Sequence, residues 1–314
     1  MEKVIIYGPS MIDLVQHVIK LPQEGEEIEP VRSLQRISGS GYCMADFFRF
    51  LKMPYLLYTC TGTGVYGSTV RKMMNLQEFE YVSVRDDVAG CRYTLVDQDG
   101  YTAVFAVPGC EYGFLPQEEA EEGRYAILDG SYLYDEESES IPDILLSEHT
   151  EVMFCPNHAG VETDPVLFEA LMKTGPMVHL SEEEAGLLGE NDTPDLREIA
   201  EGISRKSGNA VIVLRTDGSG YYHAPGNAFT VPSFVHEIKD RSGMQEAHAA
   251  AFVLARSSGV DVRSAMQFAG ECAALAAESD LAVIREKDYE YIRQLLIDAI
   301  MTESKGGRAE GPLS

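Results

Sequence analysis

Short apolar runs alternate with helical patterns along most of the chain. Apolar runs of a few residues are typical of buried strands, and apolar positions repeating every three or four residues are typical of helices. The expected strands are 4–8, 55–60, 125–129, 151–154, 177–180 and 210–215, and the expected helices are 41–53, 66–75, 165–173, 182–188 and 195–206. This alternation predicts an α/β fold, with a doubly wound, mostly parallel sheet flanked by helices.

Two segments, 14–38 and 89–107, show instead strand-like runs split by turns, and the second contains an Asp-Gly turn signal at Gly100. They predict a small β-sheet lid over the carboxyl edge of the main sheet, where ligands bind in open α/β folds. We therefore expect an α/β core of residues 1–13, 39–88 and 108–303, the lid, and a flexible tail over 304–314. Exposed edges of the lid also predict a homodimer interface.

Charge and composition narrow the class of partner. The chain has 314 residues with 25 Lys and Arg against 51 Asp and Glu, a formal charge of -26. This charge disfavours binding to nucleic acid or to an anionic membrane, and leaves a small molecule as the expected partner. Acidic clusters at 118–122 and 135–139 are expected on solvated surface.

The six cysteines are scattered without a CxxC pair, which predicts reduced, buried thiols. The chain opens on a strand without signal-peptide features, and no apolar run reaches membrane-spanning length. A cytoplasmic protein is expected.

The segment Asp240–Glu246 carries the most specific chemical signal. It follows a strand-like run over 234–238 and precedes an alanine-rich stretch, 247–255, so a helix is expected to begin near Ser242. A glycine turn that opens a helix presents backbone N–H groups and the positive end of the helix dipole to an anion. The same letters also fit a capping box between Ser242 and Gln245 with Glu246 as a first-turn acid, and both interpretations stay open.

The order of several motifs resembles the ribokinase-like (PfkB) carbohydrate kinase family over residues 3–298. These motifs are Gly8–Asp13, Leu21–Glu26, Ser38–Ala45, Gly62–Gly67, Pro108–Gly109, Cys155–Asn157, Ser181–Ala185 and Asp240–Glu246. The resemblance implies the ribokinase-like fold and an ATP-dependent kinase that acts, with Mg²⁺, on a hydroxyl of a small sugar, polyol or nucleoside.

The resemblance also assigns roles to residues. It implies an acceptor site formed by Asp13 at the end of the first strand, Gly39, Gly41, Cys43 and Asn157. It implies a nucleotide and phosphate site formed by Ser181, Glu184, Arg215, Thr216, Gly218, Arg241, Ser242, Met244 and Gln245. Glu184 would reach magnesium through water, Gly243 would support the anion hole, and Glu246 would be the catalytic base.

Four matched positions depart from the family pattern, which has Lys, Asn, Gly and Asp where this chain has Ser40, Cys43, Gln245 and Glu246. The extra methylene of Glu246 moves the carboxylate by about 1 Å, and a displacement of that size costs about 100-fold in rate. Two functions therefore stay open. One is a sugar kinase, and the other is a catalytically degraded relative that binds sugar or nucleotide as a sensor or regulatory protein.

Overall fold

The computed structural model describes residues 3–83, 87–113, 123–134, 141, 151–157, 165–188 and 195–306. The two acidic clusters expected on solvated surface, 118–122 and 135–139, lie outside these residues, as does the tail from residue 307 onward.

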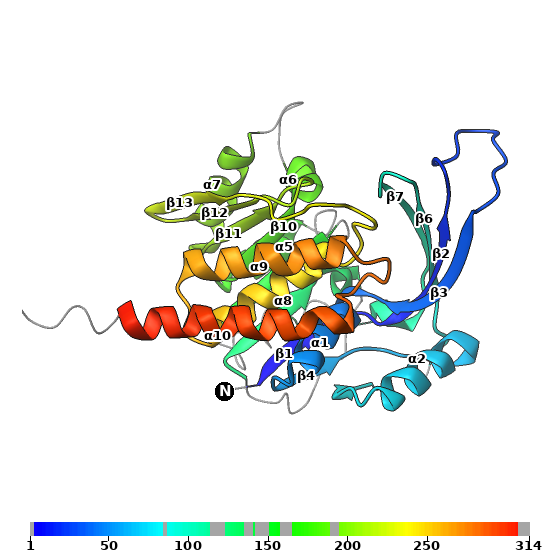
Figure 1. Ribbon diagram of the computed structural model, residues 1–314, viewed down its shortest axis with the longest axis horizontal. Helices are drawn as coiled ribbons and strands as arrows, with labels where there is room; N and C mark the ends of the chain where they lie inside the picture. The colour runs from blue at the N-terminus through cyan, green and yellow to red at the C-terminus, as the bar shows by residue number, and fades with distance from the viewer. Residues whose placement is uncertain are drawn as a thin grey trace, which may run out of the picture.

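A large sheet forms the centre of the molecule (Figure 1). Its order within the described residues is β13-β12-β11-β10-β9-β8-β1-β4-β5. The strands are β1 (Val4–Tyr7), β4 (Tyr55–Tyr58), β5 (Tyr81–Val82), β8 (Tyr125–Asp129), β9 (Glu151–Cys155), β10 (Met177–Ser181), β11 (Val211–Leu214), β12 (Gly220–Ala224) and β13 (Asn227–Val231). In this spatial order, neighbouring strands from β11 through β10, β9, β8, β1 and β4 to β5 pair in parallel. The strands β12 and β13 extend the sheet as an antiparallel hairpin.

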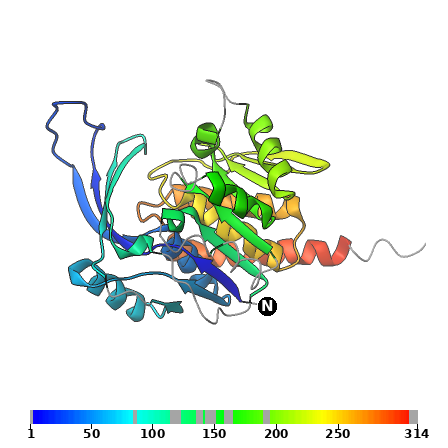
Figure 2. The same cartoon turned by 180° about the vertical axis from the view of Figure 1, so that it is seen from behind.

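Helices cover both faces of this sheet, as Figures 1 and 2 show from opposite sides. One face carries α1 (Ser40–Leu51), α8 (Met244–Ser257), α9 (Val262–Ala277) and α10 (Tyr289–Gly306), and the other carries α5 (Pro165–Lys173), α6 (Glu182–Leu188) and α7 (Leu196–Ser207). The helix α2 (Gly64–Leu76) packs beside the small sheet. Short 3-10 turns lie at Cys110–Tyr112, Gly130–Tyr134 and Glu286–Asp288.

The alternation of side chains along each strand builds two cores. In β1, Val4 and Ile6 join the cluster under α1, α8 and α9, whereas Ile5 and Tyr7 join the cluster under α5 and α7. Successive side chains of a strand point to opposite faces, so an uninterrupted apolar strand requires cover on both sides. The predicted doubly wound α/β fold is confirmed.

The small sheet stands beside this core in both views, with the order β3-β2-β6-β7 (Figures 1 and 2). Its strands are β2 (Met11–His17), β3 (Arg32–Ser38), β6 (Cys91–Val96) and β7 (Thr102–Val107). The predicted hairpin around Gly100 is present as β6 and β7. Because β2 begins at Met11, Asp13 lies inside a strand of the small sheet and not at the end of the first strand.

Several boundaries differ from the sequence prediction. The expected strand over 234–238 is absent among the described residues, and the chain there runs as a loop after the β12–β13 hairpin, which the pattern did not predict. The helix α8 begins at Met244, two residues after Ser242, as expected. The helix α10 extends to Gly306, into the segment expected as tail.

Two histidines meet inside the core between the sheet and α8. His179 of β10 and His248 of α8 are fully buried, and their ring nitrogens Nε2 and Nδ1 are 2.9 Å apart. Burial lowers the pKa of His179 to about 3, and burial together with His179 lowers the pKa of His248 well below 6.5. Both rings are therefore neutral in the folded protein at neutral pH.

This pair predicts a loss of stability in mild acid. Below about pH 6.5 the unfolded chain protonates both rings while the folded chain does not, so the free energy of unfolding decreases as pH falls. Each ring contributes up to about 1.4 kcal/mol per pH unit. Chemical denaturation between pH 7.5 and 5.5 measures this slope, and His248→Leu removes one ring's share of it. A variant of the exposed His236, His236→Gln, is the control, and an unchanged slope in His248→Leu contradicts the assignment.

Candidate active site

The carboxyl ends of the parallel strands bring most of the predicted site residues to one edge of the sheet. Asp129 ends β8, Asn157 follows β9, Ser181 ends β10 and Arg215 follows β11. Ligands of open α/β sheets bind along this edge. The candidate site therefore lies between this edge and the small sheet.

Asp13 of β2 is held by donors from three neighbouring side chains. Its Oδ2 accepts hydrogen bonds from Arg36 Nε at 3.1 Å and Arg92 Nη2 at 3.0 Å, and its Oδ1 accepts one from Thr94 Oγ1 at 2.6 Å. Burial alone would raise the pKa of Asp13, but the charges of Arg92 and Arg36 and these hydrogen bonds outweigh it, so the pKa lies below its ordinary value. Asp13 is a buried carboxylate.

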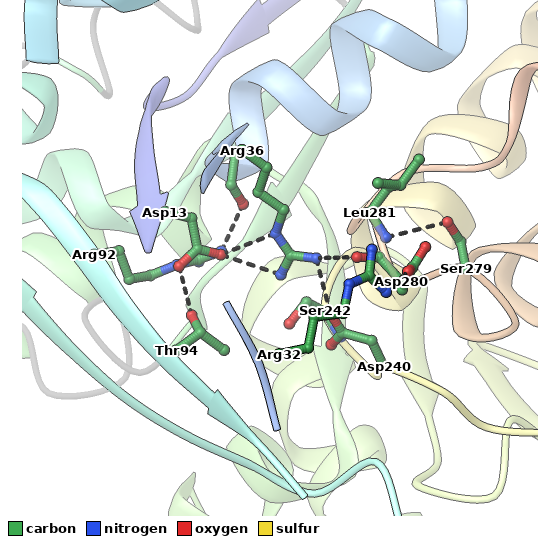
Figure 3. Close-up of polar contacts among 11 residues, drawn as sticks. Asp13, Arg32, Arg36, Arg92, Thr94, Asp240, Ser242, Ser279, Asp280 and Leu281 are labelled. Atoms are coloured by element: carbon green, nitrogen blue, oxygen red, sulfur yellow. Dashed lines mark hydrogen bonds and ion pairs between the residues drawn. The ribbon is translucent and has the colours of Figure 1, made fainter. Parts of the chain in front are cut away.

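Arg36 connects the small sheet to the segment that precedes α8 (Figure 3). Besides its contact with Asp13, its Nη1 donates to Asp240 Oδ2 at 2.8 Å and to the carbonyl oxygen of Asp280 at 3.1 Å. The other carboxylate oxygen of Asp240 accepts the backbone N–H of Ser242 at 2.8 Å. One guanidinium thus ties Asp13 to the turn that opens α8.

The turn at the start of α8 requires glycine. Gly243 is the N-cap with φ of 80°, and a Cβ there would lie 1.8 Å from the carbonyl oxygen of Ala282. Ala247 donates the first hydrogen bond of the helix, to Gly243. The amide of Gln245 therefore lies ahead of the helical ladder, where an N–H group is available to an anion.

The capping-box interpretation of this turn is wrong. The N-cap is Gly243 and makes no side-chain cap hydrogen bond, and Gln245 Nε2 donates instead to Glu184 Oε2 at 2.9 Å. Met244 is buried against Leu214 and α9. Gln245 has helical backbone angles. Its φ is not positive, so a side chain at this position causes no strain. The substitutions are accommodated without backbone strain.

Glu246 lies in the first turn of α8, close to several charged groups. Burial raises the pKa of its carboxyl above the ordinary value of 4.5, and Asp129 and Glu184 add to the rise, while its own backbone N–H and Arg92 oppose it. A carboxyl whose pKa is moved toward neutrality is suited to take a proton. The structure brings this residue together with charged groups from the small sheet and from the sheet edge.

The predicted acceptor residues lie at the start of α1 and at the carboxyl end of β9. Gly39 and Gly41 are buried where α1 begins, and a Cβ on Gly41 would lie 2.2 Å from the carbonyl oxygen of Gly8. Asn157 donates to Asp129 Oδ1 at 2.8 Å. Burial raises the pKa of the Cys43 thiol, so Cys43 is a packed thiol and not a nucleophile.

Two adjoining cavities flank the turn on the side away from Asp13. Their volumes are about 850 and 230 Å³, and both are lined by Glu182, Arg215, Thr216 and Arg241. The smaller one also reaches Ser181, Glu184, Ser242, Met244 and Gln245. Most of the predicted nucleotide residues therefore share one concave region of ligand size.

Two arginines contribute charge to these cavities. The Nε atoms of Arg215 and Arg241 are buried without a hydrogen-bond partner in the part of the chain that the structure describes. Arg241 stacks on Tyr101 at 4.4 Å and donates to the carbonyl oxygen of Asp99 at 3.1 Å, so the hairpin of the small sheet lies over it. Gly218 shapes the loop after β11, donating to the carbonyl oxygen of Arg215.

The acidic side chains of the described residues do not form a metal-binding cluster. Over the described ranges, no group of three or more His, Cys, Asp or Glu side chains is arranged to hold a metal ion. Glu184 is buried, and its Oε2 accepts the Ser181 N–H at 2.8 Å as well as the Gln245 amide. Magnesium commonly binds through one or two carboxylates, waters and substrate phosphates, so these residues fit a magnesium ion held mainly by a nucleotide.

Three residues of the site were missed by the sequence analysis: Arg36, Arg92 and Asp129. Asp129 carried a usable signal, because an acid ends an apolar strand in an expected parallel sheet. The arginines did not, since their partners Asp13 and Asp240 are distant in sequence.

None of the helices in the described segments combines the length and apolarity that crossing a bilayer requires.

The fold is the ribokinase-like fold, and the resemblance to the ribokinase-like (PfkB) family is confirmed. The chain is 26% identical over 286 residues to an ATP-dependent ribose-1-phosphate kinase of Halopiger xanaduensis, which covers 88% of this chain and 92% of that protein. No model of a known protein family matches it.

Solved structures agree on the fold. The ribokinase of Thermotoga maritima superposes with a TM-score of 0.77 at 18% identity, over 94% of this chain and 100% of the other. A nucleoside kinase of Burkholderia thailandensis in complex with inosine gives 0.75 at 14% identity, over 93% and 98%. The proteins that this chain resembles are sugar and nucleoside kinases.

The Arg36 bridge predicts a large effect on stability. Arg36→Leu leaves Asp13 and Asp240 without this buried partner, and breaking such a pair costs about 3–5 kcal/mol. Denaturant unfolding measures the loss. Arg124→Leu, which removes the exposed pair with Glu151, is the control and costs less than about 1 kcal/mol. Equal losses in the two variants would contradict the central role of Arg36.

Proposed function

We propose that this chain is an ATP-dependent kinase that transfers the γ-phosphoryl group to a hydroxyl of a small sugar or nucleoside. The observation that carries the proposal is the position of Glu246. Its carboxyl lies in the first turn of α8, where burial raises its pKa and the charges of Arg92, from the small sheet, and of Asp129 and Glu184, from the sheet edge, also act on that pKa. A proton acceptor thus stands between a candidate acceptor site and a candidate phosphate site.

The reaction would use groups that the fold already positions. The acceptor hydroxyl loses its proton to the carboxylate of Glu246 as its oxygen attacks the γ-phosphorus, and the bond from that phosphorus to the bridging oxygen of the leaving ADP breaks. The backbone amide of Gln245, ahead of the α8 ladder, and the guanidinium groups of Arg215 and Arg241 would stabilise the charge on the phosphoryl oxygens.

Magnesium fits this scheme as an ion that arrives with the nucleotide. Glu184 would contact it through water, and Gln245 and the Ser181 N–H would orient the Glu184 carboxylate. When bound, the ion would neutralise charge on the phosphate groups. Gln245, which replaces a glycine of the family pattern, would then act as a positioning residue for Glu184.

The alternative of a sensor or regulatory protein rests on the same substitutions. The family pattern is changed at Ser40, Cys43, Gln245 and Glu246. The Gln245 amide also donates to Glu184 Oε2, an oxygen that could otherwise contact a metal ion or its water. A binding protein would keep the cavities and lack turnover. If a screen of ribose, ribose 1-phosphate and inosine with ATP gives no ADP while a ligand raises the melting temperature, this alternative stands and the kinase proposal fails.

Two other expectations stay predictions. The β7 edge of the small sheet exposes Val104, Phe105 and Val107 by 52%, 58% and 51%, which suits a homodimer through the lid. A cytoplasmic location also stays a prediction.

Removing the carboxylate of Glu246 is expected to abolish transfer. Glu246→Gln should lower kcat by about 10²–10⁴-fold, because a neutral amide does not accept the hydroxyl proton. A coupled assay for ADP release measures it, with Glu290→Gln, an 86% exposed acid on α10, as the matched control. If Glu246→Gln turns over like the control, Glu246 is not the base.

The pH profile gives a second test of the same assignment. Because burial raises the pKa of Glu246 above 4.5, kcat should increase with pH through a midpoint above 4.5 as the carboxylate forms. Glu246→Asp, which restores the residue of the family pattern, keeps a carboxylate and should therefore retain the acid limb. An acid limb that persists unchanged in Glu246→Gln would assign the titration to another group.

A further inference from the structure

Asp13 is not accessible to a ligand in this structure. Its side chain is 0% exposed, and the donors of Arg36, Arg92 and Thr94 occupy its oxygens. A carboxylate that binds sugar hydroxyls must leave oxygen lone pairs facing the site. Asp13 therefore acts as the counter-ion that orients two arginines, and the expectation that it accepts hydrogen bonds from a sugar is not supported by its surroundings.

Arg92 is the charged group that the small sheet presents in place of this carboxylate. Its side chain is 22% exposed, compared with 6% for Arg36. One nitrogen, Nη2, holds it to Asp13 and, at 2.5 Å, to Ser38 Oγ. Its Nε is buried and has no hydrogen-bond partner within the described residues. The guanidinium is fixed at one end and retains donors at the other.

The contact with Ser38 places Arg92 beside Gly39, where α1 begins, on the predicted acceptor side of the site. The charge of Arg92 acts on Glu246 and on Cys43, at the turn where α1 begins, and lowers the pKa of both groups against burial. Arg36 is divided between Asp13 and Asp240, so Arg92 is the arginine left to meet a ligand. Arg92 thus joins the buried Asp13 to the turn at which α1 begins.

A guanidinium presents only donors, in a planar fork that matches the oxygens of a phosphate or carboxylate. Charge-assisted hydrogen bonds to an anion are roughly twice as strong as those to a neutral hydroxyl. Because the position next to the base offers such donors, the acceptor that fits it carries an anionic group.

We propose that the acceptor is a phosphorylated sugar, and that Arg92 is the specificity-determining residue that binds its phosphate monoester. This inference rests on the kinase function proposed above. It accounts for the burial of Asp13 beneath two arginines, and it agrees with the 26% identity to a ribose-1-phosphate kinase. The phosphate of the acceptor would lie against the small sheet, leaving its free hydroxyl toward Glu246.

Titration calorimetry on the full chain tests the proposal with three named ligands: ribose, ribose 1-phosphate and inosine. The wild type should bind ribose 1-phosphate about 10- to 100-fold more tightly than ribose or inosine, the factor expected for hydrogen bonds to a charged group. Arg92→Gln should remove that preference and change the Kd for ribose by less than about threefold. Arg92→Lys should keep part of the preference, because it retains the charge and loses the fork.

Arg124→Gln removes one positive charge from an exposed site and serves as the matched control, with unchanged affinities expected. The proposal is overturned if the wild type binds ribose as tightly as ribose 1-phosphate, or if Arg92→Gln weakens both ligands equally. Should Arg92→Gln fail to fold, the ligand preference of the wild type and its partial retention in Arg92→Lys decide the question.

The same ligands separate this inference from the kinase proposal. Preferential binding of ribose 1-phosphate without ADP release in the presence of ATP would support the role of Arg92 and contradict the kinase function. Turnover of ribose or inosine without any preference for the phosphorylated sugar would support the kinase function and contradict the role of Arg92.

Discussion

The buried contact of Arg36 with Asp13 and Asp240 holds the two halves of the site in register (Figure 3). Charges withdrawn from water are stable only when they are paired and hydrogen-bonded, so each member of this cluster fixes the position of the others. Asp240 also accepts the Ser242 N–H and thereby shapes the turn before α8. A contact within the small sheet consequently determines where the start of α8 can lie.

The residues that depart from the family pattern at the start of α8 therefore fit the side chains around them. Gly243 keeps the only conformation in which the turn can pack on Ala282, Met244 anchors the helix in the core, and Gln245 bonds to Glu184. Met244 and Gln245 differ from the family pattern, but Met244 has packing partners and Gln245 has a hydrogen-bond partner in this structure. The local geometry preserves an anion site while its neighbours change.

Much of the fold could be predicted from the pattern of the sequence. Uninterrupted apolar strands such as Val4–Tyr7 require cover on both faces, and this alone favours a doubly wound sheet. The β12–β13 hairpin was not predicted, because neither strand contains an uninterrupted apolar run and β13 is largely exposed. The anion turn was predicted from its place before an alanine-rich helix and the candidate base from the resemblance to the kinase family, but the residues that surround them were not.

The sequence by itself determined the order of strands and helices, the glycine turn before α8 and the acidic residue at its first turn, because these depend on local periodicity and local backbone conformation. Only the tertiary structure decided that Asp13 is a buried counter-ion and that Arg92 connects it to Ser38 at the start of α1. Those outcomes depend on contacts between residues as far apart as 36 and 240, whose pairing is set by burial and charge in three dimensions.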